Sequence, residues 1–221
     1  MADAPGAVLL DVDGTLVDTN WIHTMAWARA LRRHDHVVPM HRIHPLVGMG
    51  ADRLVDELLG HDVPGIGDTH HEEYEALRPE VRLLPGAVDL IRSLEHAGLQ
   101  VVLASSARED ELAFVRELLD VDDLLAAATS SDDAEVSKPA PDIFRAGLDR
   151  VRTAPARAVV VGDTVWDMHA AVDAGITGIG VLTGGARGAE LIAAGAAEVY
   201  EDAAALSEAL YESVIGSLIE G

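Results

Sequence analysis

The sequence predicts an α/β protein: a parallel β-sheet with helices on both faces and an all-helical segment inserted after the first strand. Short apolar runs alternate along most of the chain with stretches of helical periodicity, which is typical of parallel sheets covered on both faces. Residues 18–83 interrupt this alternation with helical patterns and no convincing strand. With 221 residues, the chain is long enough for one ordinary core and a small insert, but too short for two large cores.

The predicted strands are short apolar runs, at residues 7–10, 99–104, 158–162 and 176–182. Helices are expected between them, because apolar residues recur there at helical spacing. The insert is expected to contain three helices, at residues 20–33, 52–59 and 69–77. Thr69 and Glu72 have the spacing of a capping box that would open the third of these helices. An Ala/Glu-rich stretch at residues 202–219 is predicted to be a final helix.

These elements divide the chain into two expected domains. Residues 1–17 and 84–221 are assigned to the sheet-containing core, and residues 18–83 to a helical cap above the first strand.

The composition favours a small partner, since a formal net charge of −22 disfavours nucleic acid and anionic membranes, which are bound through basic patches. The first residues lack a positively charged leader, and no apolar run approaches the roughly 18 residues of a membrane helix, so a cytoplasmic location is expected.

Polar residues that carry chemistry follow the predicted strands. Parallel sheets gather ligands at the carboxyl ends of their strands, so these residues are expected to converge. The chain has no cysteine, which leaves oxygen, nitrogen and metal chemistry. Of sixteen basic residues fifteen are arginine, and the single lysine, Lys138, precedes the third predicted strand. The converging set is Asp11, Asp13, Ser105, Ser106, Lys138, Asp163 and Asp167.

Carboxylates placed this closely repel one another unless a cation lies among them, and oxygen ligands without histidine or cysteine suit Mg²⁺. A magnesium site that recruits phosphate oxygens, with a lysine and a hydroxyl for the remaining oxygens, is suited to phosphoryl transfer. In that interpretation Asp11 is the nucleophile that forms an aspartyl-phosphate. Asp13 would protonate the leaving oxygen and later deprotonate the attacking water.

Four segments resemble the motifs of the haloacid dehalogenase superfamily and occur in its order: residues 11–15 (Asp-Val-Asp-Gly-Thr), Ser105, Lys138 and residues 162–167 (Gly-Asp-Thr-Val-Trp-Asp). The resemblance covers nearly the whole chain, because the insert is placed like that family's C1 cap. It implies a Rossmann-like core, Mg²⁺ bound by Asp11, the carbonyl of Asp13 and Asp163 with Asp167 close by, and a phosphate gripped by Ser105 and Lys138. Gly14, Thr15 and Ser106 complete the predicted phosphate-binding set.

Simpler interpretations exist for several of these residues. Asp13-Gly14 is a common turn, Ser105-Ser106 would cap a helix beginning near Glu109, and Asp167 would suit the first turn of a helix. Eight of the ten histidines lie in residues 18–83, but their spacing fits no recognised zinc set, so they are expected to face solvent. His23 and Trp27 are candidates for substrate contacts from the cap, as in the β-phosphoglucomutase-like branch, or for helix packing.

Hydrolysis of a small phosphate monoester is the favoured reaction. A dehalogenase would need neither Asp13 nor a metal, and the sequence provides for both. A phosphonoacetaldehyde hydrolase would need a lysine in the cap, whereas the single lysine, Lys138, lies outside the cap. Asp-Gly-Thr and Gly-Asp-x-x-x-Asp look like the phosphoglycolate-phosphatase type, while His23 and Trp27 leave a sugar-phosphate mutase open. A non-catalytic phosphate-binding protein is the remaining alternative. Sequence leaves open the substrate's identity and the choice between monomer and homodimer.

Overall fold

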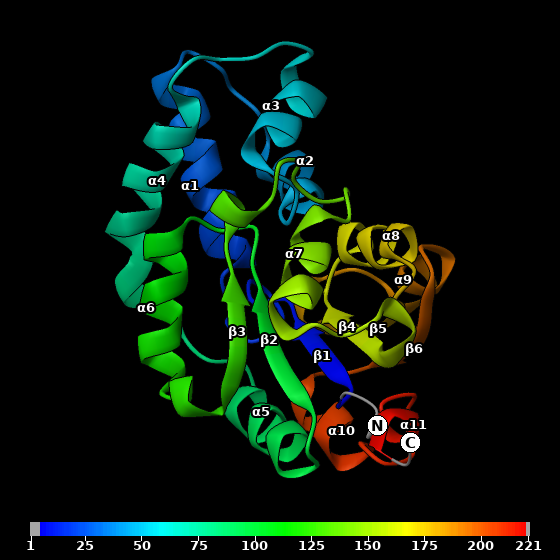
Figure 1. Cartoon of the computed structure of the whole chain (residues 1–221). Helices are drawn as coiled ribbons and strands as arrows, with labels where there is room; N and C mark the ends of the chain where they lie inside the picture. The colour runs from blue at the N-terminus through cyan, green and yellow to red at the C-terminus, as the bar shows by residue number, and fades with distance from the viewer. Residues whose placement is uncertain (1–4, 220–221) are drawn as a thin grey trace.

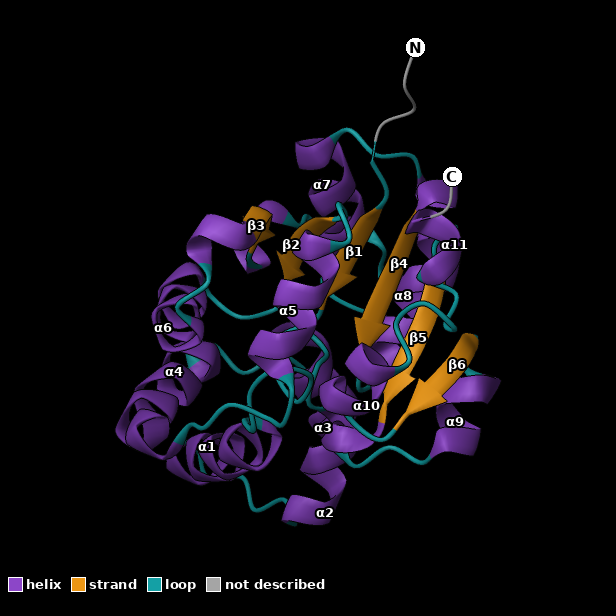
Figure 2. Ribbon diagram, turned by 90° about the horizontal axis from the view of Figure 1, so that it is seen from below, coloured by secondary structure: helices purple, strands orange, loops and turns teal. Residues whose placement is uncertain are grey.

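A computed structural model describes residues 5–219 and contains one six-stranded parallel sheet with the order β3-β2-β1-β4-β5-β6. The strands run through its centre in Figure 1 and are drawn in orange in Figure 2. The predicted α/β class with a Rossmann-like parallel sheet is therefore confirmed. The strands are β1 (Ala7–Leu10), β2 (Gln100–Ala104), β3 (Leu125–Thr129), β4 (Ala158–Gly162), β5 (Thr177–Val181) and β6 (Ala196–Tyr200).

Alternate residues of the central strands bury opposite faces of the sheet. Along β1, Val8 and Leu10 join the core that contains α5 (Ala87–His96), α6 (Glu109–Leu119) and α10 (Ala203–Glu208). Ala7 and Leu9 join the opposite core with α7 (Asp142–Val151) and α8 (Val165–Ala174). A continuous apolar strand with both faces covered is the pattern that parallel sheets require. Two short helices complete the core: α9 (Gly188–Ala193) beside β5 and β6, and α11 (Gly216–Ile219).

Helices α1 to α4, which follow β1, form a separate apolar cluster at the upper end of Figure 1. They are α1 (Asn20–Arg33), α2 (Met40–Ile43), α3 (Ala51–Leu59) and α4 (Ile66–Leu77). The chain leaves the sheet and returns to it at adjacent points, because Val17 and Leu83 form an antiparallel bridge. This bridge lies at the predicted limits of the cap, whose assignment as a domain remains a prediction. Among residues 5–219, every helix is too short or too polar to cross a membrane.

The structure corrects several predicted elements. Edge strands β3 and β6 were not expected from the sequence. The predicted capping box is wrong, because α4 begins at Ile66, so Thr69 lies inside the helix and not at its N-cap, and its hydroxyl donates to the carbonyl of Gly65. The predicted helix at residues 202–219 is also wrong as one element: α10 ends at Glu208 and α11 begins at Gly216. Gly216 packs against the Tyr211 carbonyl so closely that a Cβ there would lie 2.2 Å from its oxygen.

Candidate active site

Asp11, Asp163 and Asp167 meet at the carboxyl ends of neighbouring strands. Asp11 directly follows β1, Asp163 directly follows β4, and Asp167 lies in the first turn of α8. One carboxylate oxygen from each lies within 4.8 Å of the others, and all three side chains are buried. The sequence predicts that these residues converge, and the parallel pairing of β1 with β4 brings the two strand ends side by side.

Lys138 lies beneath these carboxylates with only 1% of its surface exposed. Its Nζ is 2.5 Å from Oδ1 of Asp11 and 2.8 Å from Oδ1 of Asp167, and it also donates to the Ala104 carbonyl at 3.3 Å. A buried ammonium is tolerated because two carboxylates and a carbonyl replace its water. Proximity to Asp11 and Asp167 more than offsets the effect of burial and raises the pKa of Lys138, so the ammonium stays charged.

The single positive charge of Lys138 does not balance the negative charges of Asp11, Asp163 and Asp167. Burial, followed by the neighbouring Asp167 carboxylate, raises the pKa of Asp11 to about 7. Burial and the Asp11 carboxylate likewise hold the pKa of Asp163 well above its usual range. Crowded, desolvated carboxylates of this kind are stabilised in their charged form by a divalent cation, and an all-oxygen donor set suits Mg²⁺. The residues therefore fit the expected metal.

Asp163 is held in place by two neighbours on the segment that follows β1. The Thr15 hydroxyl lies 3.0 Å from Oδ2 of Asp11 and 3.1 Å from Oδ1 of Asp163, and the Asn20 amide donates to Oδ2 of Asp163 at 2.7 Å. Gly14 has φ +81°, and a Cβ there would lie 2.3 Å from Oδ2 of Asp163. Only glycine fits that turn. The structure places Gly14 and Thr15 against the carboxylates, while their contact with phosphate remains a prediction.

Asp13 forms a second polar centre on the cap side of Asp11. Its Oδ1 accepts the Thr19 hydroxyl at 2.7 Å and lies 3.2 Å from Nε2 of His23, and its Oδ2 is 3.4 Å from the Ser105 hydroxyl. Burial acts to raise the pKa of Asp13, but the hydrogen bonds from His23 and Thr19 outweigh it, so the pKa is lowered. His23 has the reverse balance, because its contact with Asp13 outweighs burial and raises its pKa. His23 of the cap thus contacts Asp13 directly, while its contact with substrate remains a prediction.

The simpler interpretations fare differently. The serines do not cap α6, whose N-cap is Arg108; the buried Ser105 hydroxyl instead accepts the backbone N–H of Ala107 at 3.0 Å. Asp167 does act as a first-turn residue, since it forms a capping box with Thr164, and it contacts Lys138 at the same time. The capping interaction fixes the carboxylate that faces Lys138, so its two roles support each other.

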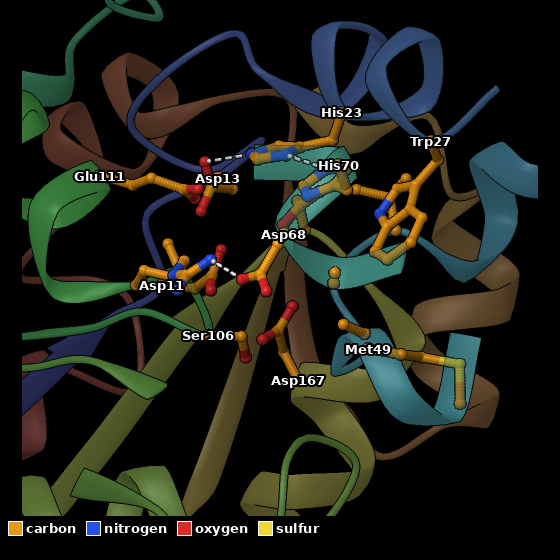
Figure 3. A pocket seen from close by; sticks show the side chains of 17 residues that line it. Asp11, Asp13, His23, Trp27, Met49, Asp68, His70, Ser106, Glu111 and Asp167 are labelled. Carbon is orange, nitrogen blue, oxygen red and sulfur yellow. Dashed lines mark hydrogen bonds and ion pairs between the residues drawn. The ribbon is translucent and has the colours of Figure 1, made fainter. Parts of the chain in front are cut away.

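A cavity of about 290 Å³ lies between the carboxylates and the cap (Figure 3). The core contributes Asp11, Asp13, Ser106, Arg108, Glu111, Asp163 and Asp167, and the cap contributes His23, Trp27, Met49, Asp68 and His70 among others. Ser106 and Trp27 were predicted for the site, whereas Asn20, Asp68, His70, Arg108 and Glu111 were not. Asn20 could have been found from the sequence, because it is a polar residue at the start of the first insert helix, a few residues after the Asp-x-Asp segment.

Not all cap histidines face solvent, contrary to the expectation from the sequence. His70 stacks on Trp27 with ring centroids 4.1 Å apart, and its Nε2 lies 3.3 Å from Nδ1 of His23. His71 lies 2.8 Å from Oε1 of the buried Glu111. Burial holds the pKa of His70 well below its usual range, with the nearby His23 acting in the same direction. Figure 3 shows His23 between Asp13 and His70.

Known proteins resemble this chain in sequence and in fold. A model described as haloacid dehalogenase-like hydrolase matches residues 5–175. A phosphoglycolate phosphatase from Agrobacterium fabrum is 28% identical over 222 residues, covering 94% of this chain and 93% of the relative. A β-phosphoglucomutase from Bacillus subtilis is 26% identical over 191 residues, covering 80% and 84%. The crystal structure of a hydrolase from Pseudomonas syringae has a TM-score of 0.89 and 32% identity, covering 94% and 98%. The chain belongs to the haloacid dehalogenase-like hydrolase family and is an enzyme of that type.

Proposed function

We propose that the protein is a Mg²⁺-dependent phosphatase that hydrolyses a small phosphate monoester through an aspartyl-phosphate on Asp11. The observation that carries the proposal is the contact of Lys138 with both Asp11 and Asp167, beside Asp163, at one edge of the sheet. A buried ammonium next to a nucleophilic carboxylate can hold phosphoryl oxygens during transfer. The phosphatase names among the relatives support the same reaction class.

Mg²⁺ would be held by Asp11, the carbonyl of Asp13 and Asp163, with Asp167 close by, as the family resemblance implies. When bound, such an ion neutralises charge on the phosphoryl oxygens and orients them. Lys138 and the Ser105 hydroxyl would hold further oxygens, and Ser106, Gly14 and Thr15 would line the same subsite. These residues leave the phosphorus facing Asp11.

The proposed reaction has two balanced steps. An oxygen of Asp11 forms a bond to phosphorus while the bond to the leaving oxygen breaks, and Asp13 passes to that oxygen the proton of its hydrogen bond with His23. Water then attacks the phosphorus, Asp13 takes one of its protons, and the bond to Asp11 breaks. Thr19 and His23 position the Asp13 carboxyl for both transfers.

Phosphate release from p-nitrophenyl phosphate with Mg²⁺ tests the proposal. Asp11→Asn is expected to abolish turnover, since an amide oxygen is a poor nucleophile. Asp18→Asn is the matched control, because Asp18 lies on the same connecting segment with its side chain exposed, and this variant should retain activity. Undiminished turnover by Asp11→Asn would refute the proposal.

A sugar-phosphate mutase is the second candidate, supported by the β-phosphoglucomutase relative and by the contact of His23 with Asp13. β-Glucose 1-phosphate separates the two reactions. A phosphatase releases inorganic phosphate from it, whereas a mutase accumulates glucose 6-phosphate without free phosphate. A cytoplasmic location, a small phosphorylated metabolite as substrate, and a monomeric or homodimeric state remain part of the proposal.

A further inference from the structure

Glu111 reaches the cavity from α6 on the side of Asp13 (Figure 3). The residue is only 4% exposed, and its Oε1 lies 2.8 Å from Nδ1 of His71. Burial raises the pKa of Glu111, while the nearby His23 and the hydrogen bond with His71 act to keep the carboxylate charged. Under the proposed function, Asp13 protonates the leaving oxygen, so the leaving group must extend past Asp13 toward the cap. Glu111 therefore borders the leaving group and not the phosphoryl group, which lies with Lys138 and the metal ligands.

The leaving-group end of the cavity is lined by few positively charged side chains. Among the described residues that line the cavity, Arg108 is the one with a permanent cation, and its guanidinium lies 3.1 Å from Oδ1 of Asp68. Both side chains are at the solvent-exposed mouth, at 50% and 78% exposure, where water weakens their attraction for a third charge. His70 stays neutral because burial holds its pKa well below the usual range. His23, whose pKa is raised, lies 3.2 Å from Asp13, so its positive charge is already paired with that carboxylate.

The remaining wall is apolar or small. Trp27, Val47, Met49, Ala51 and Gly67 line the cavity on the cap side. A second carboxylate or phosphate on the leaving group would lose water against this wall and face Glu111, without a free cation to replace the lost hydration. A hydroxyl, by contrast, can donate to Glu111 and leave its carbon atoms against the apolar residues.

We infer that the substrate is a phosphate ester of a neutral, hydroxylated alcohol, and that Glu111 determines this specificity by accepting a hydroxyl and rejecting a second anionic group. This inference rests on the proposed function for the position of the phosphate. It separates the chain from a phosphatase specialised for carboxylated esters. The alternative is that Arg108 turns away from Asp68 and binds an anionic leaving group.

Two matched ester pairs test the inference, each differing only in a CH₂OH or a carboxylate at one end. They are glycerol 3-phosphate against 3-phosphoglycerate, and 2-hydroxyethyl phosphate against 2-phosphoglycolate. With Mg²⁺ at pH 7.5, kcat/KM for each hydroxyl ester should exceed that of its carboxylate partner by about tenfold or more, as expected when a site built for one polar group meets another. Equal values, or a preference for the carboxylates, would overturn the inference.

Glu111→Gln probes the assigned residue, because it keeps the shape and removes the charge. The ratio of kcat/KM within each pair should fall about tenfold toward unity, mainly through a lower KM for the carboxylate esters. Asp110→Asn is the matched control: Asp110 contacts the same His71 but is 61% exposed, and the ratio should not change. A wild-type preference for carboxylates that disappears in Arg108→Met would establish the alternative.

A binding measurement tests the specificity inference independently of the proposed function, because it does not require turnover. Asp11→Asn should bind glycerol 3-phosphate more tightly than 3-phosphoglycerate in isothermal titration, whether or not the wild-type chain turns over either ester. Failure of p-nitrophenyl phosphate hydrolysis would refute the phosphatase proposal. Tighter binding of 3-phosphoglycerate would refute the specificity inference alone.

Discussion

The Lys138 ammonium lies 2.5 Å from Oδ1 of Asp11, and both side chains are almost completely buried. Lys138→Met would leave Asp11 and Asp167 facing each other without a cation. Removing one partner of a buried ion pair costs about 3–5 kcal/mol, so the free energy of unfolding in urea with EDTA should fall by that amount. Arg116→Met, which removes a partly exposed pair with Asp122, should cost less than about 1 kcal/mol. Equal losses for the two variants would contradict this account.

The carboxylate cluster predicts that Mg²⁺ stabilises the fold. A ligand that binds only the native state adds about 2.7 kcal/mol at one hundred times its Kd, so Tm should rise with MgCl₂ at constant ionic strength. Asp163→Asn should lose most of this rise, because it removes one of the three carboxylates that could hold the ion. Asp149→Asn, an exposed acid on α7, should keep it. A rise of the same size in Asp163→Asn would place the ion elsewhere.

The strand ends of the site could be predicted because each of them follows a continuous apolar run in the sequence. Asp11 and Asp163 directly follow buried strands, and parallel pairing of β1 with β4 brings them together. The missed strands have weaker signals for a physical reason. β3 reads Leu-Ala-Ala-Ala-Thr and β6 reads Ala-Ala-Glu-Val-Tyr, and as sheet edges both are partly exposed, so neither needs the continuous apolar run of a central strand.

Residues that reach the site from helices were harder to predict. Glu111 is one of three acids in the first turn of α6, and nothing in its spacing separates it from the exposed Glu109. Its partner inside the fold is His71, forty residues away in the chain. His70 likewise owes its place to the packing of α4 against α1, where Trp27 and His23 lie. Such positions follow from tertiary structure, which local patterns do not encode.

His70 gives a prediction for stability against pH. Its pKa in the folded chain lies well below the value of about 6.5 expected when unfolded, so the unfolded chain binds the proton more readily. The stability contributed by neutral His70 is complete above pH 6.5 and is lost as the pH falls from there through the folded pKa. His70→Gln removes the titration, so its Tm should fall less than that of the wild type between pH 7.5 and pH 5. Parallel curves would show that His70 does not control this dependence.

The acidic composition gives a prediction for salt. Acidic residues outnumber basic ones by 38 to 16, so repulsion between carboxylates exceeds their attraction to basic side chains. Salt shortens the range of that repulsion from about 10 Å at 0.1 M to about 3 Å at 1 M. It also weakens exposed pairs such as Arg33–Glu72, but each contributes only about 0–1 kcal/mol. Tm should therefore rise as KCl is increased toward 1 M, and a falling Tm would mean that the exposed ion pairs outweigh the repulsion.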